Sequence, residues 1–391
     1  MFKREIDFKV IFLSVYYLAF YLCRFNFVPI VPLLLKHFDV TYLEVGLIGS
    51  FVFLGYSITL TLAGIMSDVF GAIKIIIVGA FMSSIANLLS SLASNLWQLV
   101  FFALLNGLSQ GMIWPSLMNL VVTTYGREKI DYVIGAILTA AIVGPSITFS
   151  VIGIIVAFYG WRLGFVLPAL ILTCLTLYFL VIIKKPRRFQ RKALGKYDFK
   201  LALTNRDVWL LGLTYACFYF IMRGFSSWMP SYFIEKYSMT IISASLLSGV
   251  FLSINVVGAF IGTWIANVKF KGNKKRVMLI SLILSSVFNA ALTLNDHLDM
   301  FLLPLLLLSL SLCEWFFFSL IPSITPREFS GTASGIVDTL GYLGSLTGAY
   351  FIGWFYDRRL PYSLLFFTFF ILTSTAVLTA FLIKIDSSYK R

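Results

Sequence analysis

The chain is 391 residues long, 59% hydrophobic and 12% charged, and it carries a formal net charge of +14. Soluble domains have about a quarter charged residues, so this composition excludes a soluble globular protein and indicates an integral membrane protein. The positive charge makes nucleic acid a candidate partner, but the distribution of Lys and Arg along the chain argues against it.

Apolar segments recur from one end of the chain to the other. Each is long enough to cross a hydrocarbon core about 30 Å thick as a helix, and the short connections leave no room for a soluble catalytic domain. The sequence therefore predicts an all-α integral membrane fold. Its twelve transmembrane helices are expected over 10–35, 44–67, 73–93, 97–124, 131–158, 162–183, 208–234, 241–267, 277–294, 300–322, 330–356 and 361–384.

A basic loop over 184–200, KKPRRFQRKALGKYDFK, divides these segments six and six. With both termini in the cytosol, most of the 31 lysines and arginines fall on the cytosolic side, as the positive-inside rule requires. The loop is therefore a topology anchor that can also touch anionic lipid headgroups, and no nucleic-acid partner is expected. We expect a multi-pass monomer in the plasma or inner membrane, surrounded by the lipid bilayer.

The two halves of the chain repeat one another. A shift of 198 residues superposes Pro32 on Pro230 and Gly64 on Gly262. A duplicated six-span bundle is the architecture of many secondary transporters, whose substrate sites lie near the membrane midplane between the halves. The predicted domains are an N-terminal six-helix bundle over 1–183, a cytosolic basic linker over 184–206 and a C-terminal six-helix bundle over 207–391.

Few ionisable side chains remain at membrane depth once the loops are set aside. A charge at the centre of a span costs about 2.5–3.5 kcal/mol on insertion scales, so such groups face the bundle interior or a water-filled cavity. Two are basic and two are acidic: Arg24, Arg223, Glu314 and Asp338. These four are the first candidates for a functional site.

Arg24 and Arg223 lie in the first span of each half, at almost equivalent places in the repeat. Arginine keeps its proton, and its planar fork suits bidentate pairing with carboxylate or phosphate oxygens. We therefore expect one or both arginines to bind a small anionic substrate. The alternative is that Glu314 and Asp338 pair with the arginines for purely structural reasons.

Polar and aromatic side chains accompany the arginines at helical spacing. In the fourth span, Asn106, Gln110 and Trp114 recur every four residues and form one stripe, which suits either interhelical bonding or a cavity wall. Phenolic hydroxyls are natural donors to an oxyanion. The tyrosines that share the helix faces of the two arginines are Tyr17, Tyr21, Tyr215 and Tyr219.

Asp338 and Glu314 also have two interpretations. They either balance the arginines in the empty carrier or carry a proton, since burial favours the protonated carboxyl group. The sequence contains no nucleophile–base constellation, phosphate-cradling glycine loop, ATPase motif or metal-ligand spacing. We therefore expect no enzyme activity, cofactor or metal, and transport has to run on gradients or on exchange.

The loop GIMSDVFGAIK (64–74) is similar to the G-x-x-x-D-[RK]-x-G-[RK]-[RK] loop of the major facilitator superfamily, which the chain resembles over its full length. Gly64, Asp68 and Gly71 are present, while Val69 stands where the superfamily has a basic residue. In that superfamily the loop latches the cytosolic helix ends during switching. The resemblance implies that these three residues form a conformational gate.

Four further stretches are similar to the organophosphate:inorganic phosphate antiporters of that superfamily, which include glycerol-3-phosphate and hexose-phosphate carriers. In these carriers the arginines of the first and seventh spans clamp the phosphate, which implies the same role for Arg24 and Arg223. The stretches are YLCRFNF (21–27), NGLSQGMIWPS (106–116), RGFSSWMPSYF (223–233) and GTASGIVDTLGYLG (331–344).

The chain departs from these carriers at substrate-specific positions. The segment ILTAAIVGPSI (137–147) has alanines where glycerol-3-phosphate carriers have a histidine, and Ser334 and Val337 replace an Asp and a Lys of the hexose-phosphate carriers. The resemblance therefore identifies neither glycerol-3-phosphate nor a hexose phosphate as the substrate of this chain. We expect an alternating-access carrier that exchanges a phosphate ester for inorganic phosphate. The alternatives are a proton-coupled symporter of a carboxylate or other small anion, and a transporter-like ligand sensor.

Overall fold

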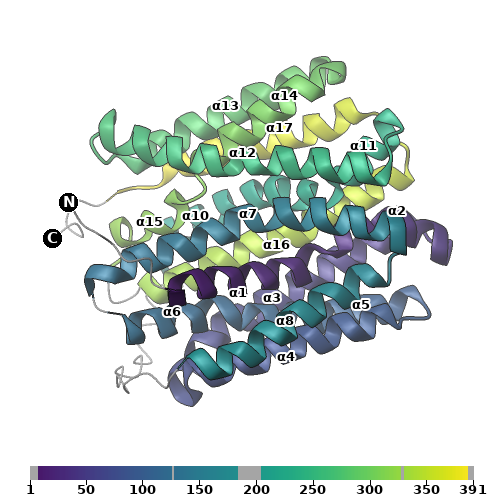
Figure 1. The fold of residues 1–391 in the computed structure, drawn as a ribbon. Helices are drawn as coiled ribbons and strands as arrows, with labels where there is room; N and C mark the ends of the chain where they lie inside the picture. Colours follow the sequence, from purple (N-terminus) through teal and green to yellow (C-terminus); the bar gives the residue numbers. More distant parts are fainter. Residues whose placement is uncertain (1–7, 126, 184–203, 327–329, 386–391) are drawn as a thin grey trace. The chain divides into compact units, whose positions relative to one another are not determined.

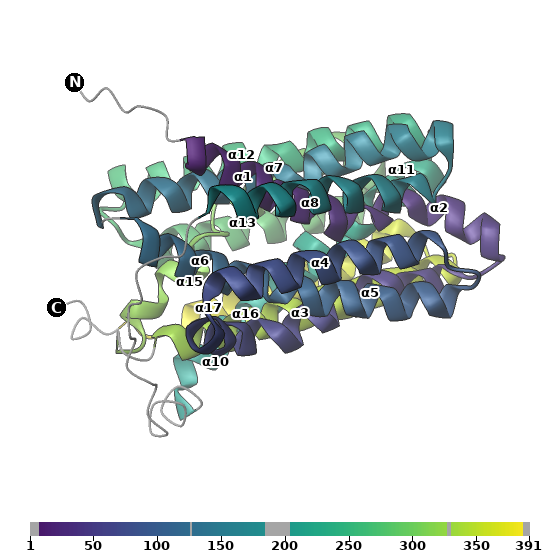
Figure 2. The same cartoon turned by 60° about the horizontal axis from the view of Figure 1, so that its bottom comes forward.

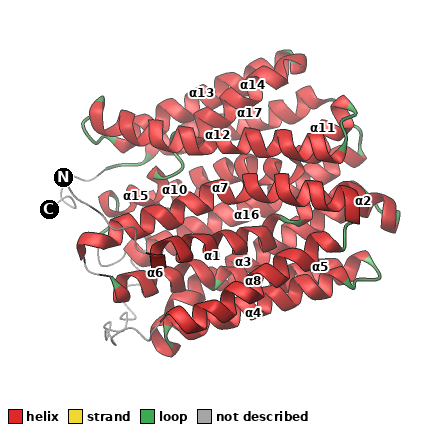
Figure 3. Ribbon diagram, in the orientation of Figure 1, coloured by secondary structure: helices red, strands yellow, loops and turns green. Residues whose placement is uncertain are grey.

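The computed structural model describes residues 8–125, 127–183, 204–326 and 330–385, and the regular elements in these ranges are all helical (Figure 3). Most of the predicted linker, 184–203, lies outside the described residues. Eleven helical segments among the described residues are long and apolar enough to cross a membrane. The remaining predicted segment, 330–356, forms α16 (Ser330–Asp357), whose many Gly, Ser and Thr residues lower its hydropathy. The predicted all-helical class is confirmed.

The helices of the first half run from purple to teal in Figure 1. They are α1 (Phe8–Phe25), α2 (Phe27–Phe38), α3 (Tyr42–Phe70), α4 (Ala72–Ser91), α5 (Leu96–Gly111), α6 (Ile113–Thr124), α7 (Arg127–Tyr159) and α8 (Leu163–Ile182).

The helices of the second half include several short segments. They are α10 (Arg206–Tyr219), the π-helix η1 (Phe220–Phe225), η2 (Ser226–Trp228), α11 (Met229–Tyr237), α12 (Ile241–Val268), α13 (Lys274–Leu294), η3 (Asp296–Leu298), α14 (Asp299–Ser311), α15 (Phe316–Ser319), η4 (Ile321–Ser323), α16 and α17 (Tyr362–Leu382).

The first, fourth, seventh and tenth spans are interrupted. In the first, α1 gives way to α2 at Asn26, and in the fourth, α5 gives way to α6 at Met112. In the seventh, α10 continues as a π-helix and then as a short 3₁₀ turn. In the tenth, a turn over 312–315 separates α14 from α15. Each interruption leaves irregular backbone inside a membrane-spanning segment.

Prolines explain three of these four interruptions. A proline lacks an N–H and clashes with the carbonyl group of the residue four positions earlier. The residues four positions before Pro29 and Pro115 are the last residues of α1 and α5. The residue four positions before Pro230 is the first of η2, directly after the π-helix. No proline stands at this spacing from the turn in the tenth span.

Packing divides the chain into two compact units. The first contains the described residues of 1–40, 51–192 and 229–249, and the second contains those of 41–50, 193–228 and 250–391. Each unit thus combines most of one half of the sequence with a short segment of the other. The predicted domain boundaries stay a prediction.

In the first unit, α4 packs against α5 and α8, while α1 packs against α7 and α8 (Figure 2). Two glycines bring α5 close to α3. A Cβ atom at Gly107 would meet the carbonyl oxygen of Val52, and one at Gly111 would lie 2.5 Å from that of Tyr56. Small residues at such contacts allow helix backbones to approach closely. This close approach places the α5 end of the fourth span beside α3.

In the second unit, α16 packs against α10 and η1, and its last residue is bonded to the start of α3. The Asp357 carboxylate accepts hydrogen bonds from the backbone N–H groups of Tyr42 at 2.7 Å and Leu43 at 2.8 Å. The first N–H groups of a helix have no acceptor within the helix, and its N-terminus favours negative charge. Asp357 therefore caps a helix that is distant in the sequence.

Replacing Asp357 with alanine removes both acceptors, so we expect the free energy of unfolding to fall by about 1 kcal/mol. The Asp357→Asn variant keeps one oxygen that can accept one of the two bonds, and it should lose less. Thermal unfolding of the purified protein in detergent measures both changes. A protein with Asp357→Ala that is as stable as the wild type would contradict this capping role.

Candidate functional site

Three of the four predicted charged residues lie at interruptions of the spans, whereas Asp338 lies within α16. Arg24 lies two residues before the Asn26 turn, and Gln110 is the penultimate residue of α5. Arg223 belongs to the π-helix η1, and Glu314 lies in the turn after α14. Irregular backbone at membrane depth is tolerated where it is buried in protein or lines a cavity, and π-turns are frequent at functional sites. The interruptions therefore mark where polar groups gather.

Arg24 is almost completely buried, with 2% of its surface exposed. Its Nε and Nη2 atoms donate hydrogen bonds to the Gln110 Oε1 atom at 3.2 and 3.0 Å. Its guanidinium carbon lies 4.9 Å from the ring centroid of Tyr21 and 4.5 Å from that of Tyr56. Aromatic faces attract cations, so the rings and the amide oxygen together stabilise a charge inside the first unit.

The aromatic residues predicted near Arg24 are brought together. The rings of Tyr17 and Tyr21 lie 5.4 Å apart, and Tyr17 also contacts Trp114 of α6 at 5.6 Å. The tyrosines of the first span thus meet the polar and aromatic stripe of the fourth. Nothing in the sequence distinguishes Tyr56 from the other aromatic residues of an apolar span, so its contact with Arg24 emerges from the structure alone.

A network of hydrogen bonds surrounds the Gln110 side chain. Its Nε2 atom donates to the Phe20 carbonyl oxygen at 3.1 Å and to the Ser83 hydroxyl oxygen at 2.9 Å. The Ser83 hydroxyl donates to the Asn106 Oδ1 atom at 2.7 Å, and the Asn106 Nδ2 atom donates to the Cys23 carbonyl oxygen at 2.7 Å. The two predicted amides of the fourth span therefore bond α1 and α4.

The network continues to the turn between α1 and α2. The Asn26 Nδ2 atom donates to the Asn87 Oδ1 atom at 2.8 Å and to the Gly164 carbonyl oxygen at 3.0 Å. Asn87 in turn donates to the Cys23 carbonyl oxygen at 3.3 Å. Ser83 and Asn87 are absent from the predicted site. They stand four residues apart in the third span, and that spacing is the signal that could have identified them.

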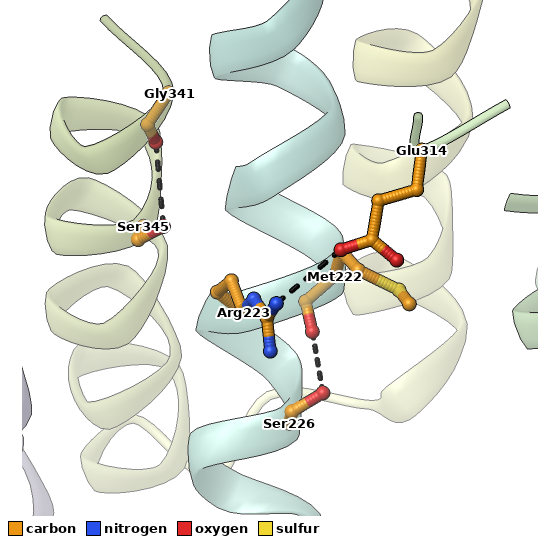
Figure 4. A network of polar contacts seen from close by, with 6 residues as sticks. All are labelled: Met222, Arg223, Ser226, Glu314, Gly341 and Ser345. Atoms are coloured by element: carbon orange, nitrogen blue, oxygen red, sulfur yellow. Dashed lines mark hydrogen bonds and ion pairs between the residues drawn. The ribbon is translucent and has the colours of Figure 1, made fainter. Parts of the chain in front are cut away.

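Arg223 forms an ion pair with Glu314 (Figure 4). The Arg223 Nη2 and Glu314 Oε1 atoms lie 3.3 Å apart, and the two side chains are 18% and 11% exposed. The Tyr219 ring lies 5.4 Å from the guanidinium carbon. The structure therefore forms one of the pairings that the structural alternative predicts, between the Arg223 Nη2 atom and Glu314.

Aromatic rings and a second acid stand close to this pair. The ring centroids of Tyr215 and Tyr219 are 4.1 Å apart, and Tyr219 meets the edge of Tyr342 at 5.8 Å. Asp338 of α16 lies near Tyr215 and Tyr219. The predicted residues of the second half are thus assembled within one unit.

The predicted gate residues lie at the junction of α3 and α4. The Asp68 Oδ1 atom and the Ser67 hydroxyl oxygen each accept a hydrogen bond of 2.8 Å from the Asn119 Nδ2 atom. Gly71 precedes α4 with φ of 93°, a conformation that favours glycine, and Gly64 lies within α3. The bonds tie α3 to α6, and the gating role stays a prediction.

Guanidinium, phenol and amide groups are the donors that these sites offer, and all of them can bond an oxyanion. Within the described ranges, no three His, Cys, Asp or Glu side chains are grouped closely enough to hold a metal ion. The guanidinium, phenol and amide groups assembled here can therefore bind an oxyanion through hydrogen bonds.

Charged side chains set into interrupted membrane helices characterise secondary carriers. The sequence model described as Major Facilitator Superfamily matches residues 13–349, and the chain belongs to that superfamily. The superfamily resemblance seen in the sequence is confirmed. The protein is a multi-pass membrane transporter of this type and not an enzyme.

Several known relatives align over most of the chain at low identity. A membrane sensor protein UhpC of Salmonella typhimurium is 23% identical over 85% of this chain and 81% of its own length. A probable hexose phosphate transport protein of Chlamydia muridarum is 22% identical over 86% and 82%. A glycerol-3-phosphate transporter of Bacillus subtilis is 23% identical over 84% and 81%. These relatives agree with the predicted antiporter resemblance.

A solved structure shares the fold. It is a bacterial homologue of the human lysosomal transporter Spinster, in an inward-facing and unoccupied conformation. The TM-score is 0.75 with 15% sequence identity, and the alignment covers 100% of this chain and 97% of the other. The predicted major facilitator fold is thereby confirmed.

Breaking the ion pair from one side should destabilise the protein more than removing it whole. The Arg223→Gln variant leaves the Glu314 carboxylate buried without this partner, and we expect a loss of about 3 kcal/mol in the free energy of unfolding. Adding Glu314→Gln should recover part of that loss. Thermal unfolding of the two single variants and the double variant measures the coupling. Additive losses would show that the pair contributes no interaction of its own.

Proposed function

We propose that the protein is a secondary active transporter that exchanges a phosphate ester for inorganic phosphate by alternating access. The observation that carries this proposal is the setting of Arg24. A buried, permanently charged guanidinium is held by the neutral Gln110 amide among tyrosine rings, at an interruption of the first span. Maintaining a charge at this depth is unfavourable, and binding an anion offsets that cost.

Arg223 is the counterpart of Arg24 in the sequence repeat, and we assign it to substrate binding on that ground. Phosphate oxygens suit the planar fork of arginine. Two of the relatives are named for phosphate esters, which supports this substrate class. The other proposed substrate-binding residues are Tyr17, Tyr21, Asn106, Gln110, Tyr215 and Tyr219.

The remaining proposals concern the conformational change of the carrier and its orientation in the membrane. Gly64, Asp68 and Gly71 form the cytosolic gate, where Asp68 bonds Asn119. Alternating access exposes the bound anion first to one face of the membrane and then to the other. The carrier works as a monomer in the plasma membrane with both termini in the cytosol.

The Arg223–Glu314 pair favours a second candidate function, a proton-coupled symporter of a carboxylate or other small anion. A carboxylate that already contacts the arginine competes with an incoming anion, and its protonation removes the competing charge. Asp338, which lies near Tyr215 and Tyr219, is the other candidate proton carrier. In a symporter the proton crosses the membrane together with the anion, and no phosphate has to cross in the opposite direction.

A third candidate is a transporter-like sensor, which binds its ligand without carrying it across the membrane. Its support is the 23% identity to a protein named as a membrane sensor. The three candidates share anion binding at Arg24 and differ in whether the bound anion then crosses the membrane and in the ion that drives its crossing.

Reconstituted liposomes loaded with inorganic phosphate separate the three. We expect them to take up labelled phosphate from outside without any imposed pH gradient, since exchange is driven by the phosphate inside. Liposomes without internal phosphate are the control and should take up little. Uptake that requires a proton gradient supports the symporter. Binding of phosphate without uptake under either condition supports the sensor.

Arg24→Lys should reduce phosphate exchange by at least about tenfold, because a lysine ammonium cannot reproduce the planar, bidentate fork. Arg162→Lys is the matched control, since Arg162 is exposed and contacts Trp161. Initial exchange rates in liposomes, normalised to folded protein, measure both. Wild-type exchange by Arg24→Lys would refute phosphate binding at this position.

A further inference from the structure

Ser83 of α4 occupies the junction of the hydrogen bonds beside Arg24. Its side chain is completely buried. The single hydroxyl group bonds both amides of the fourth span, donating to Asn106 at 2.7 Å and accepting from Gln110 at 2.9 Å. Its placement therefore links the two amides that contact α1.

The direction of these bonds is fixed by the backbone of α1. A backbone carbonyl oxygen can only accept, so the Asn106 group that faces the Cys23 carbonyl has to be the amide nitrogen. The Asn106 oxygen then faces Ser83 and needs a donor. Because a serine hydroxyl has one hydrogen, Ser83 donates to Asn106 and its oxygen is left to accept from Gln110.

The same reasoning orients the Gln110 amide. Its nitrogen faces two acceptors, the Ser83 hydroxyl oxygen and the Phe20 carbonyl oxygen. Its oxygen is consequently turned toward Arg24 and accepts from both Nε and Nη2. The series of bonds begins on α1 at Cys23 and returns to α1 at Arg24, so each donor and acceptor along it has one compatible direction.

We propose that Ser83 is a positioning residue for anion binding at Arg24, acting through the Gln110 amide. This rests on the proposed function, which gives Arg24 its anion. Without the Ser83 hydroxyl, one Gln110 hydrogen loses its acceptor and the Asn106 oxygen loses its donor. Both amides then gain freedom to reorient, and the guanidinium is less well placed when the anion arrives.

Equilibrium titration of the purified full chain with inorganic phosphate tests this role. Ser83→Ala should raise the Kd for phosphate about tenfold, because the Gln110 amide loses the hydrogen bond that holds it against Arg24. The KM for exchange in liposomes should rise with it, while the maximal rate changes less. Ser84→Ala is the matched control, because Ser84 is also buried on α4 and its hydroxyl has no hydrogen-bond partner within the described ranges. An unchanged Kd for Ser83→Ala overturns the proposal.

A double-mutant cycle shows whether Ser83 acts through Gln110. In a Gln110→Leu background, Ser83→Ala should weaken phosphate binding little further, since the amide that it orients is gone. Equal weakening in both backgrounds places the effect of Ser83 elsewhere and overturns the proposal. The cycle is non-additive only when the two residues act as a unit.

The melting temperature in phosphate-free buffer gives a readout that does not depend on any anion. The losses caused by Ser83→Ala and Gln110→Leu should be less than additive in the double variant. If the wild type fails to bind phosphate, the proposed function is wrong, and this cycle still decides whether Ser83 holds Gln110. Additive losses of melting temperature overturn the positioning role.

Discussion

A guanidinium at membrane depth cannot release its proton, so the protein has to surround it with acceptors and aromatic faces. In the first unit, the Gln110 amide oxygen and the rings of Tyr21 and Tyr56 surround Arg24 in this way. The second unit meets this need differently at Arg223, with a carboxylate in place of an amide. Gln110 supplies an acceptor without charge and Glu314 supplies one with charge. The two arginines therefore stand in different electrostatic settings.

The interruptions of the spans and the polar networks depend on one another. Prolines end α1 and α5 within a few residues of Arg24 and Gln110. Irregular backbone in a membrane requires internal hydrogen-bond partners, and side-chain amides from α4 and α5 bond the carbonyl groups of α1 near its end. Gln110 bonds both the Arg24 side chain and the backbone of the interrupted helix α1, so one amide contributes to both.

Hydropathy is enough to predict the helical class and the two arginines at membrane depth. Helical spacing is enough to predict that the amides of the fourth span lie in one stripe and that tyrosines accompany each arginine. Ser83 and Tyr56 could not be predicted, because a serine or a tyrosine in an apolar span usually packs without special bonds, and only tertiary contact reveals its partner. The π-helix at Arg223 could not be predicted either, because the spacing of side chains in the seventh span does not distinguish a π-helix from an α-helix. The ion pair with Glu314 joins two spans far apart in the sequence, so spacing alone left it as one alternative.

The side-chain bonds to the Phe20 and Cys23 carbonyl groups have a mechanical consequence. A helix held through its backbone by neighbouring helices cannot rotate about its own axis or slide along it without breaking those bonds. Displacement of Arg24 is then a collective motion of α1, α4 and α5, on the microsecond-to-millisecond scale of such motions and not the nanosecond scale of a rotamer change. The Arg24 guanidinium therefore moves together with α1 and with the residues of α4 and α5 that are bonded to it.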